Sequence, residues 1–249
     1  GYAAALTLLL LFLVLTGRIQ FSGAHGLESL PDLRPLDANE FRKVPDGVSL
    51  PEGHSMRLGE SQRFGDLVFK PVKVTREPLT FEHSRTGNAA DRLKTPPVLK
   101  LWFECQNVSD DYAFPAWDNW LMSSRFPQEG IDEDTQANSW LRIQSADAVG
   151  AAEERAVDSV GGARVLNYLQ SPANEFLIVG QDAGHSLVPG ETGTSFIACA
   201  DTIGQQTIDA ETRLTWRIQV RKGVHQDSGH GVTTLVDVSF SGSDIESSL

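Results

Sequence analysis

The chain has few positive charges for its length. Its 249 residues include 21 Lys and Arg side chains against 33 Asp and Glu, which gives a net charge of −12 at pH 7. Nucleic-acid binding requires a basic surface, and so does docking on an anionic lipid face. The acidic balance therefore argues against both partners and is typical of a solvated, self-repelling surface.

Motifs that hold nucleotides, metal ions or nucleophiles are also missing. The sequence contains no P-loop, no GxGxxG turn and no HExxH, and none of its six histidines form a pair at helical i, i+4 spacing. Gly184-His185-Ser186 begins like a nucleophile elbow, but Val188 stands where the motif requires a closing Gly. We expect no metal site, no cofactor and no catalytic centre of these kinds.

Only two cysteines occur, Cys105 and Cys199, so the chain can form at most one internal disulfide. Each lies among apolar residues in a predicted strand. A bridge would close a loop of about 95 residues, stabilise the fold by roughly 4–5 kcal/mol and require an oxidising compartment. The alternative is two free, buried thiols that pack as small apolar side chains. The sequence leaves both possibilities open.

Residues 1–21 form a transmembrane or signal segment in our interpretation. The run from Ala3 to Leu15 has no charge, and residues 2–21 would form a helix about 30 Å long, which just spans a bilayer if Arg18 reaches outward. The small residues Ser22-Gly23-Ala24 also suit signal cleavage after Ala24, which would give a secreted product. A buried helix of the domain is the third possibility.

The charges that follow this segment bear on its orientation. Arg18, Arg34, Arg42 and Lys43 favour a cytoplasmic domain by the positive-inside tendency, although long domains translocate regardless of such charges. We expect a single-pass membrane protein with an extracytoplasmic domain. Residues 22–56 show no period and are punctuated by Pro and Gly, which is typical of a linker. Alternatively, part of this stretch packs on the domain.

Residues 57–249 alternate between apolar and polar side chains, as half-buried strands do. In Leu214–Arg221, four apolar side chains face one way and four polar ones the other. One helix is expected at Ala146–Val157. The pattern predicts an all-β domain, an antiparallel Ig-like β-sandwich of about seven to nine strands. The other expected strands are Leu67–Thr75, Val98–Val108, Trp140–Ile143, Val165–Leu169, Glu175–Val179, Thr194–Ala200 and Val232–Phe240.

Three turn motifs occur in an order that resembles a known bacterial family. A Gly59-Glu60 turn precedes the first strand, Asn107-Val108-Ser109 ends a central strand, and Pro189-Gly190-Glu191 precedes another strand. The order and spacing are similar to those of Ig-like β-sandwich domains in membrane-anchored or secreted proteins of unknown function. The resemblance implies an accessory, surface-exposed role and supplies no catalytic residues.

The segment from Asp110 to Trp120 combines three carboxylates with four aromatic side chains. Tyr112, Trp117 and Trp120 are candidate anchors for a partner, because exposed aromatics dominate binding energy at interfaces. The alternative is that the large aromatics plug one end of the core. The carboxylates could also stabilise a calcium ion, although their spacing does not match an EF-hand loop.

Together these features predict a non-catalytic, membrane-tethered domain of the cell envelope. It would act as a binding or scaffold module for an unidentified protein or envelope component, with membrane contact through residues 2–21. The alternative is a hydrolase on the same scaffold that uses two carboxylates converging in one cleft. Glu104 and Asp237 are the kind of strand carboxylate that such an enzyme could use.

Overall fold

The structure is all-β and is a computed structural model. It describes residues 48–88, 94–118, 121, 138–144, 162–163, 175–199, 204–225, 229 and 231–247. The hydrophobic segment 1–21, the expected helix Ala146–Val157 and the expected strand Val165–Leu169 lie outside these residues. In the part of the chain that is described, no helix is long and apolar enough to cross a bilayer.

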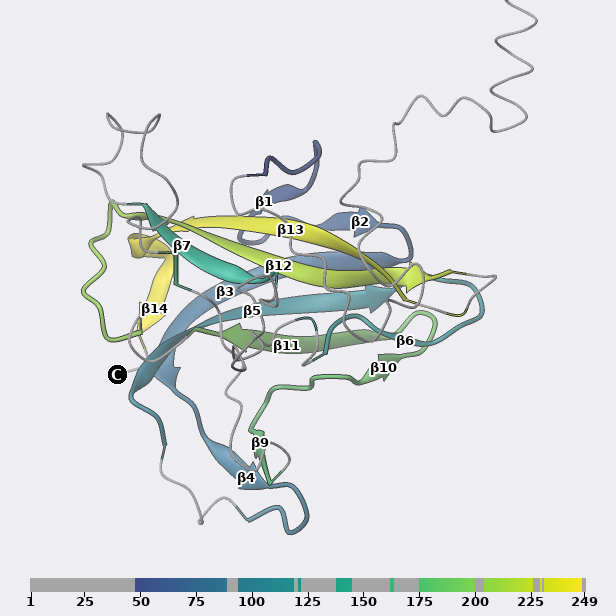
Figure 1. Ribbon diagram of the computed structural model, residues 1–249, viewed down its shortest axis with the longest axis horizontal. Helices are drawn as coiled ribbons and strands as arrows, with labels where there is room; N and C mark the ends of the chain where they lie inside the picture. Colours follow the sequence, from purple (N-terminus) through teal and green to yellow (C-terminus); the bar gives the residue numbers. More distant parts are fainter. Residues whose placement is uncertain are drawn as a thin grey trace, which may run out of the picture.

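Two five-stranded sheets make up most of the molecule (Figure 1). The first sheet has the order β1 (Ser55–Arg57), β13 (Gly231–Ser241), β12 (Arg213–Val224), β7 (Trp140–Gln144), β8 (Gly162–Ala163). The second has the order β11 (Thr192–Ala198), β5 (Pro97–Asn107), β3 (Leu67–Pro78), β14 (Ile245–Ser247), with β2 (Gln62–Phe64) also paired to β3. Most pairs are antiparallel, whereas β1 runs parallel to β13 and β14 parallel to β3.

The core lies between these two sheets. On β12 the side chains of Leu214, Trp216, Ile218 and Val220 are buried, and on β5 those from Leu99 to Cys105 at alternate positions are buried too. All of them belong to one hydrophobic cluster. The period-two alternation in the sequence therefore identified the inward faces correctly, because each strand has one face that is excluded from water.

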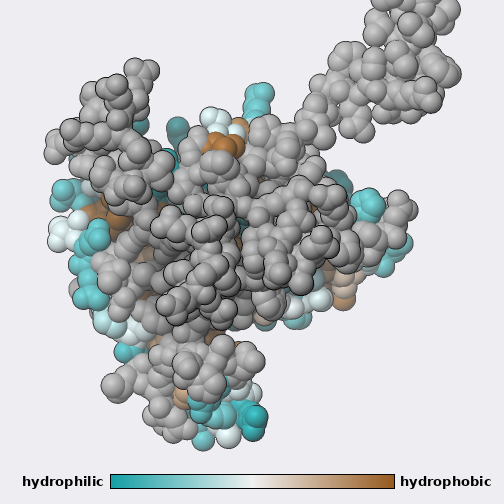
Figure 2. All heavy atoms as spheres, in the orientation of Figure 1, coloured by the Kyte–Doolittle hydropathy of each residue, from teal (hydrophilic) through white to brown (hydrophobic). Residues whose placement is uncertain are grey.

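Two smaller sheets lie outside this pair. β10 (Ser186–Leu187) pairs with β6 (Phe114–Pro115), and β4 (Phe81–His83) pairs with β9 (Phe176–Ile178) in an arm below the main body in Figure 1. Where Figure 2 shows described residues, hydrophobic colour occurs only in small separate patches. Large hydrophobic side chains that are exposed within the described residues are Leu177, Val179 and Val188.

The turn motifs noted in the sequence hold the strand ends together. Asn107 is fully buried, and its amide group donates to the carbonyls of Tyr112 and Leu187. Its side-chain oxygen accepts from the Ser109 N–H, which closes an Asx turn. Gly190, at a φ of +82°, donates its N–H to the Asn107 carbonyl. Two of the three motifs thus meet at one corner, where they are structural.

Both Gly-Glu motifs use the same chemistry. The Glu60 carboxylate accepts from the Arg57 N–H at 2.8 Å, and the Glu191 carboxylate accepts from the Val188 N–H at 2.8 Å. In each case a carboxylate satisfies a turn N–H three residues upstream. The hydrogen bond from the Val188 N–H is the main reason that the pKa of Glu191 lies below its ordinary value. The hydrogen bond with His185 lowers this pKa further.

Candidate functional site

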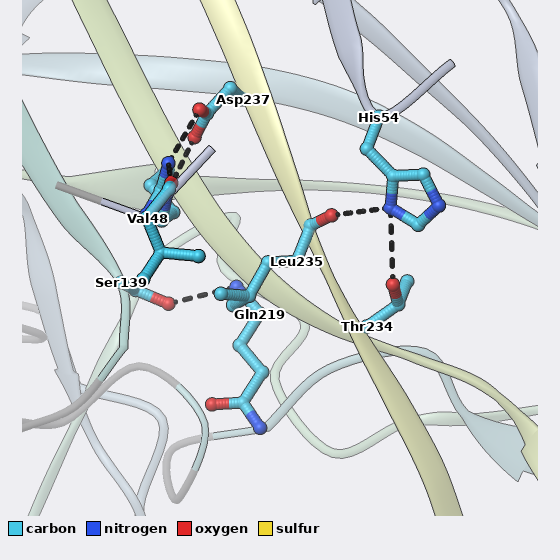
Figure 3. Close-up of polar contacts among 8 residues, drawn as sticks. Val48, His54, Ser139, Gln219, Thr234, Leu235 and Asp237 are labelled. Carbon is cyan, nitrogen blue, oxygen red and sulfur yellow. Dashed lines mark hydrogen bonds and ion pairs between the residues drawn. The ribbon is translucent and has the colours of Figure 1, made fainter. Parts of the chain in front are cut away.

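Residues 48–54 form a strap over the outer face of the first sheet and lead into β1. Val48 and Leu50 pack against the fully buried Leu235. The His54 ring bonds through Nδ1 to the Leu235 carbonyl at 2.9 Å and to the Thr234 hydroxyl at 3.2 Å (Figure 3). The last part of the predicted linker 22–56 is therefore packed on the domain, which is the alternative the sequence left open.

A buried ion pair lies under the strap. Arg217 on β12 and Asp237 on β13 are cross-strand partners, joined by two hydrogen bonds of 2.7 and 2.8 Å. The same guanidinium donates to the Val48 carbonyl at 3.0 Å and lies 4.7 Å from the centre of the Trp140 ring. The Arg217 side chain is 5% exposed and that of Asp237 14%. This pair fastens the strap to the sheet.

Beside it, a chain of buried polar side chains crosses the same face. Gln219 receives a hydrogen bond from Asn138 and donates one to the Thr233 hydroxyl, both at 3.0 Å. Its backbone N–H donates to the Ser139 hydroxyl (Figure 3). Because these groups satisfy one another inside the protein, this part of the face is structural.

An open groove of about 330 Å³ lies where the strap meets β2 and the end of β12. Glu52, Arg63 and Lys222 supply its charges, so one carboxylate and two cations line the same groove. Phe64 and His54 are both buried, and their rings lie 4.9 Å apart. The remaining lining residues are Gly53, Gln62 and Gly65. The groove is concave and partly walled by fixed side chains, as ligand sites are, and its lining is more polar than that of most such sites.

Lys222 lines the groove because β12 bulges there. Arg221 pairs with Thr233 and Gly223 with the adjacent Val232, so Lys222 is the extra residue of the bulge. In an unbroken ladder its side chain would follow Val220 into the core. Bulges are known to redirect side chains near functional sites. Gly223 has a φ of +148°, and a Cβ there would lie 3.0 Å from the Tyr112 hydroxyl, so the bulge requires glycine.

Tyr112 is half-buried, and its hydroxyl lies beside the bulge at Gly223. Its hydroxyl donates to the Asp66 carboxylate and receives a weak hydrogen bond from the Val224 N–H at 3.5 Å. Burial is the main cause that raises the pKa of the Tyr112 phenol, and the hydrogen bond to Asp66 raises it further. Asp66 also lies 3.8 Å from the Arg63 guanidinium. The predicted anchor Tyr112 is thus tied through Asp66 to the turn after β2.

Trp117 lies in the core, as the core-plug alternative expects. Its side chain is 4% exposed and packs edge-on against Phe103, with ring centroids 5.5 Å apart. A cavity of about 20 Å³, roughly one water molecule in size, lies beside it. The Trp117 side chain is therefore not open to a partner in this conformation. Trp120 lies outside the described residues.

The two cysteines are free and buried. The Cys199 N–H bonds to the Leu99 carbonyl, and Cys105 lies six positions further along β5. At about 3.3 Å per residue the thiols are roughly 20 Å apart, well beyond the ~7 Å between Cα atoms that a disulfide allows. Burial raises the pKa of Cys199 to about 11 and also raises that of Cys105. The disulfide is therefore excluded in this fold.

No family model and no curated protein matches this chain. Among solved structures, the yjhA protein from Bacillus subtilis aligns with 74% of this chain and 99% of its own, at 12% sequence identity and a TM-score of 0.35. A likeness at that level carries no argument about fold or function. The function is accordingly inferred from the residues of the chain itself.

Glu104 and Asp237 do not share a cleft. Glu104 lies on the outer face of the second sheet, where it pairs with Lys70 at 3.2 Å, and Asp237 lies on the outer face of the first. The core separates them, so these two carboxylates do not converge. Within the residues described, no group of three or more His, Cys, Asp or Glu side chains is placed to hold a metal ion.

The groove could not be predicted from local sequence patterns. Glu52 and Arg63 are separated from Lys222 by well over a hundred residues, so no local pattern joins them. One signal was available. The apolar alternation of β12 stops at Lys222-Gly223, and a glycine inside a strand pattern indicates a bulge. That signal predicts a redirected side chain at Lys222, although not what it faces.

Proposed function

We propose that this chain is a non-catalytic, membrane-tethered domain of the cell envelope that acts as a binding or scaffold module on an Ig-like β-sandwich. The groove of about 330 Å³ between the strap and β2 carries the binding part of this proposal. It brings side chains from three distant segments to one concave surface. One of them, Lys222, reaches it through a bulge that only glycine at position 223 permits.

The order of the strands supports the Ig-like assignment. In Ig domains, strands A, B and E share one sheet, and G, F and C, with C′ in variable-type domains, share the other. When the strands are lettered in chain order, β3, β5 and β11 correspond to A, B and E, which are neighbours in one sheet. The neighbouring strands of the other sheet, β13, β12, β7 and β8, correspond to G, F, C and C′. The parallel pairing of β1 with β13 extends the second of these sheets. Both sheets contribute to one core, as the sandwich requires.

The binding role is tested with a photo-cross-linking residue at Gln62 in the full chain, in its own envelope. Gln62 is exposed and lines the groove. The matched control carries the same residue at the exposed Glu211. We expect a discrete cross-linked product from position 62 that is absent from position 211. Equal products from both positions, or none from position 62, would refute the binding role.

Membrane tethering is tested by alkaline carbonate extraction of the full chain. We expect the wild-type chain to stay with the membranes. The double variant Leu9→Arg, Phe12→Arg should be released, because each arginine at the centre of a spanning helix costs about 2.5–3.5 kcal/mol. The intact mass decides between anchor and signal peptide, since cleavage after Ala24 would remove the segment. A fully soluble, uncleaved wild-type chain would contradict both interpretations.

A further inference from the structure

We infer that the groove binds a small zwitterion, that is, an amino acid or short peptide with both termini free. This inference rests on the proposed binding function and names the ligand class. The ammonium group would face Glu52, and the carboxylate would face Arg63 and Lys222. Both kinds of charge line one groove, and a ligand with complementary charges of both signs matches them best.

The charge balance decides between a zwitterion and a simple anion. Arg63 and Lys222 are positive, and Glu52 is negative. Asp66 lies 3.8 Å from Arg63 and offsets part of its charge from behind the groove. Two positive and two negative groups therefore make the site nearly neutral. A plain anion such as phosphate would meet Glu52 without compensation, whereas a zwitterion satisfies the carboxylate and the cations together.

Arg63 is positioned to bind. Its Nε–H donates to the Gly65 carbonyl at 2.7 Å, which fixes the plane of the guanidinium, while the side chain is 64% exposed. A guanidinium has five N–H donors in a rigid fork that fits a carboxylate with two hydrogen bonds. One donor thus orients the group, and others face solvent. Arginine suits recognition of a terminal carboxylate better than a flexible amine would.

The walls that carry these charges are held in place before any ligand arrives. His54 is bonded to Leu235 and Thr234, which sets the strap beside Glu52. The Lys222 carbonyl accepts the Asp66 N–H at 2.7 Å, which fixes the bulge against the turn after β2. Pre-organisation lowers the entropy cost of binding. A volume of about 330 Å³ lies at the small end of ligand pockets and suits a small ligand.

The test is calorimetric titration of the full chain in detergent with trialanine. Three related probes accompany it: N-acetyl-trialanine, which lacks the ammonium group, trialanine amide, which lacks the carboxylate, and inorganic phosphate. We expect saturable binding of trialanine and at least about 10-fold weaker binding of each of the others, the loss typical of one charged contact. Equal binding of the acetylated or amidated peptide, or tighter binding of phosphate, would overturn the inference.

Single variants of the charged groove residues test whether trialanine binds in the groove. Glu52→Gln, Arg63→Gln and Lys222→Met should each weaken trialanine binding about 10-fold or more. Arg213→Gln is the matched control, because Arg213 is an exposed cation at the opposite end of β12. An equal loss in the control would show that only net charge matters and would refute the site. If trialanine fails to bind while the Gln62 cross-link forms, the zwitterion inference fails and the binding module stands. If neither is seen, both fail.

Discussion

Removing the guanidinium of Arg217 is the sharpest test of how the strap is held. Arg217→Met deletes two charge-assisted hydrogen bonds to Asp237 and one to the Val48 carbonyl. It leaves the Asp237 carboxylate, whose side chain is only 14% exposed, without its cation. Breaking a buried pair from one side costs about 3–5 kcal/mol. Because Asp237 keeps some contact with water, we expect about 3 kcal/mol.

A double variant separates the contribution of the ion pair from the cost of leaving one charge buried without its partner. Arg217 Nη1 has no hydrogen-bond partner within the described residues, so the wild-type pair is incompletely satisfied. Replacing both members by apolar side chains, Arg217→Met with Asp237→Leu, should cost no more than about 1 kcal/mol, because no charge remains buried. The assay is urea unfolding of the full chain in detergent, with Arg213→Gln as the control. A loss below about 1 kcal/mol in the single variant would refute the reasoning.

Three further predictions follow from the core, the thiols and one turn. Trp117→Ala should lower the free energy of unfolding by about 3–5 kcal/mol in urea unfolding, because it opens a cavity beside Phe103; a loss under 1 kcal/mol would place Trp117 outside the core. Cys105 and Cys199 should both react with a thiol reagent in the unfolded, unreduced protein and resist it when folded, as burial raises both pKa values; protection after unfolding would indicate a bridge. The lowered pKa of Glu191 means that its carboxylate stabilises the fold above its ordinary value of 4.5 and loses that effect as pH falls through the lower, folded value. The stability difference between wild type and Glu191→Gln should therefore shrink between pH 5 and pH 3, and a constant difference would contradict it.

The long strands could be predicted from the sequence because each has one buried face. Leu214, Trp216, Ile218 and Val220 repeat at every second residue, and burial of that face follows directly. β1 and β14 could not be predicted, since three residues are too few to show a period. Their pairing is set by distant strands, β13 and β3, to which they run parallel.

The functional residues were harder to predict, because exposure is a property of the whole fold. Aromatic side chains in an acidic segment suggested anchors, yet Trp117 fills the core and Tyr112 is bonded to Asp66. Arg217 occupies an outward position on β12, where alternation predicts contact with water, but the strap covers it. No local pattern reveals that a segment more than 150 residues earlier in the sequence returns to bury that face.

The parallel register of β1 and β13 determines how the domain bears a mechanical load. Because the two strands run parallel, a pull between the N-terminal end of β1 and the C-terminal end of β13 acts along both strands in opposite directions, across the three paired positions from Ser55 to Arg57. Such a force loads their hydrogen bonds in shear, so they must break together, while a peeling geometry would open them one at a time. Such tension would therefore be resisted by the β1–β13 pairing before it reached the strands of the core.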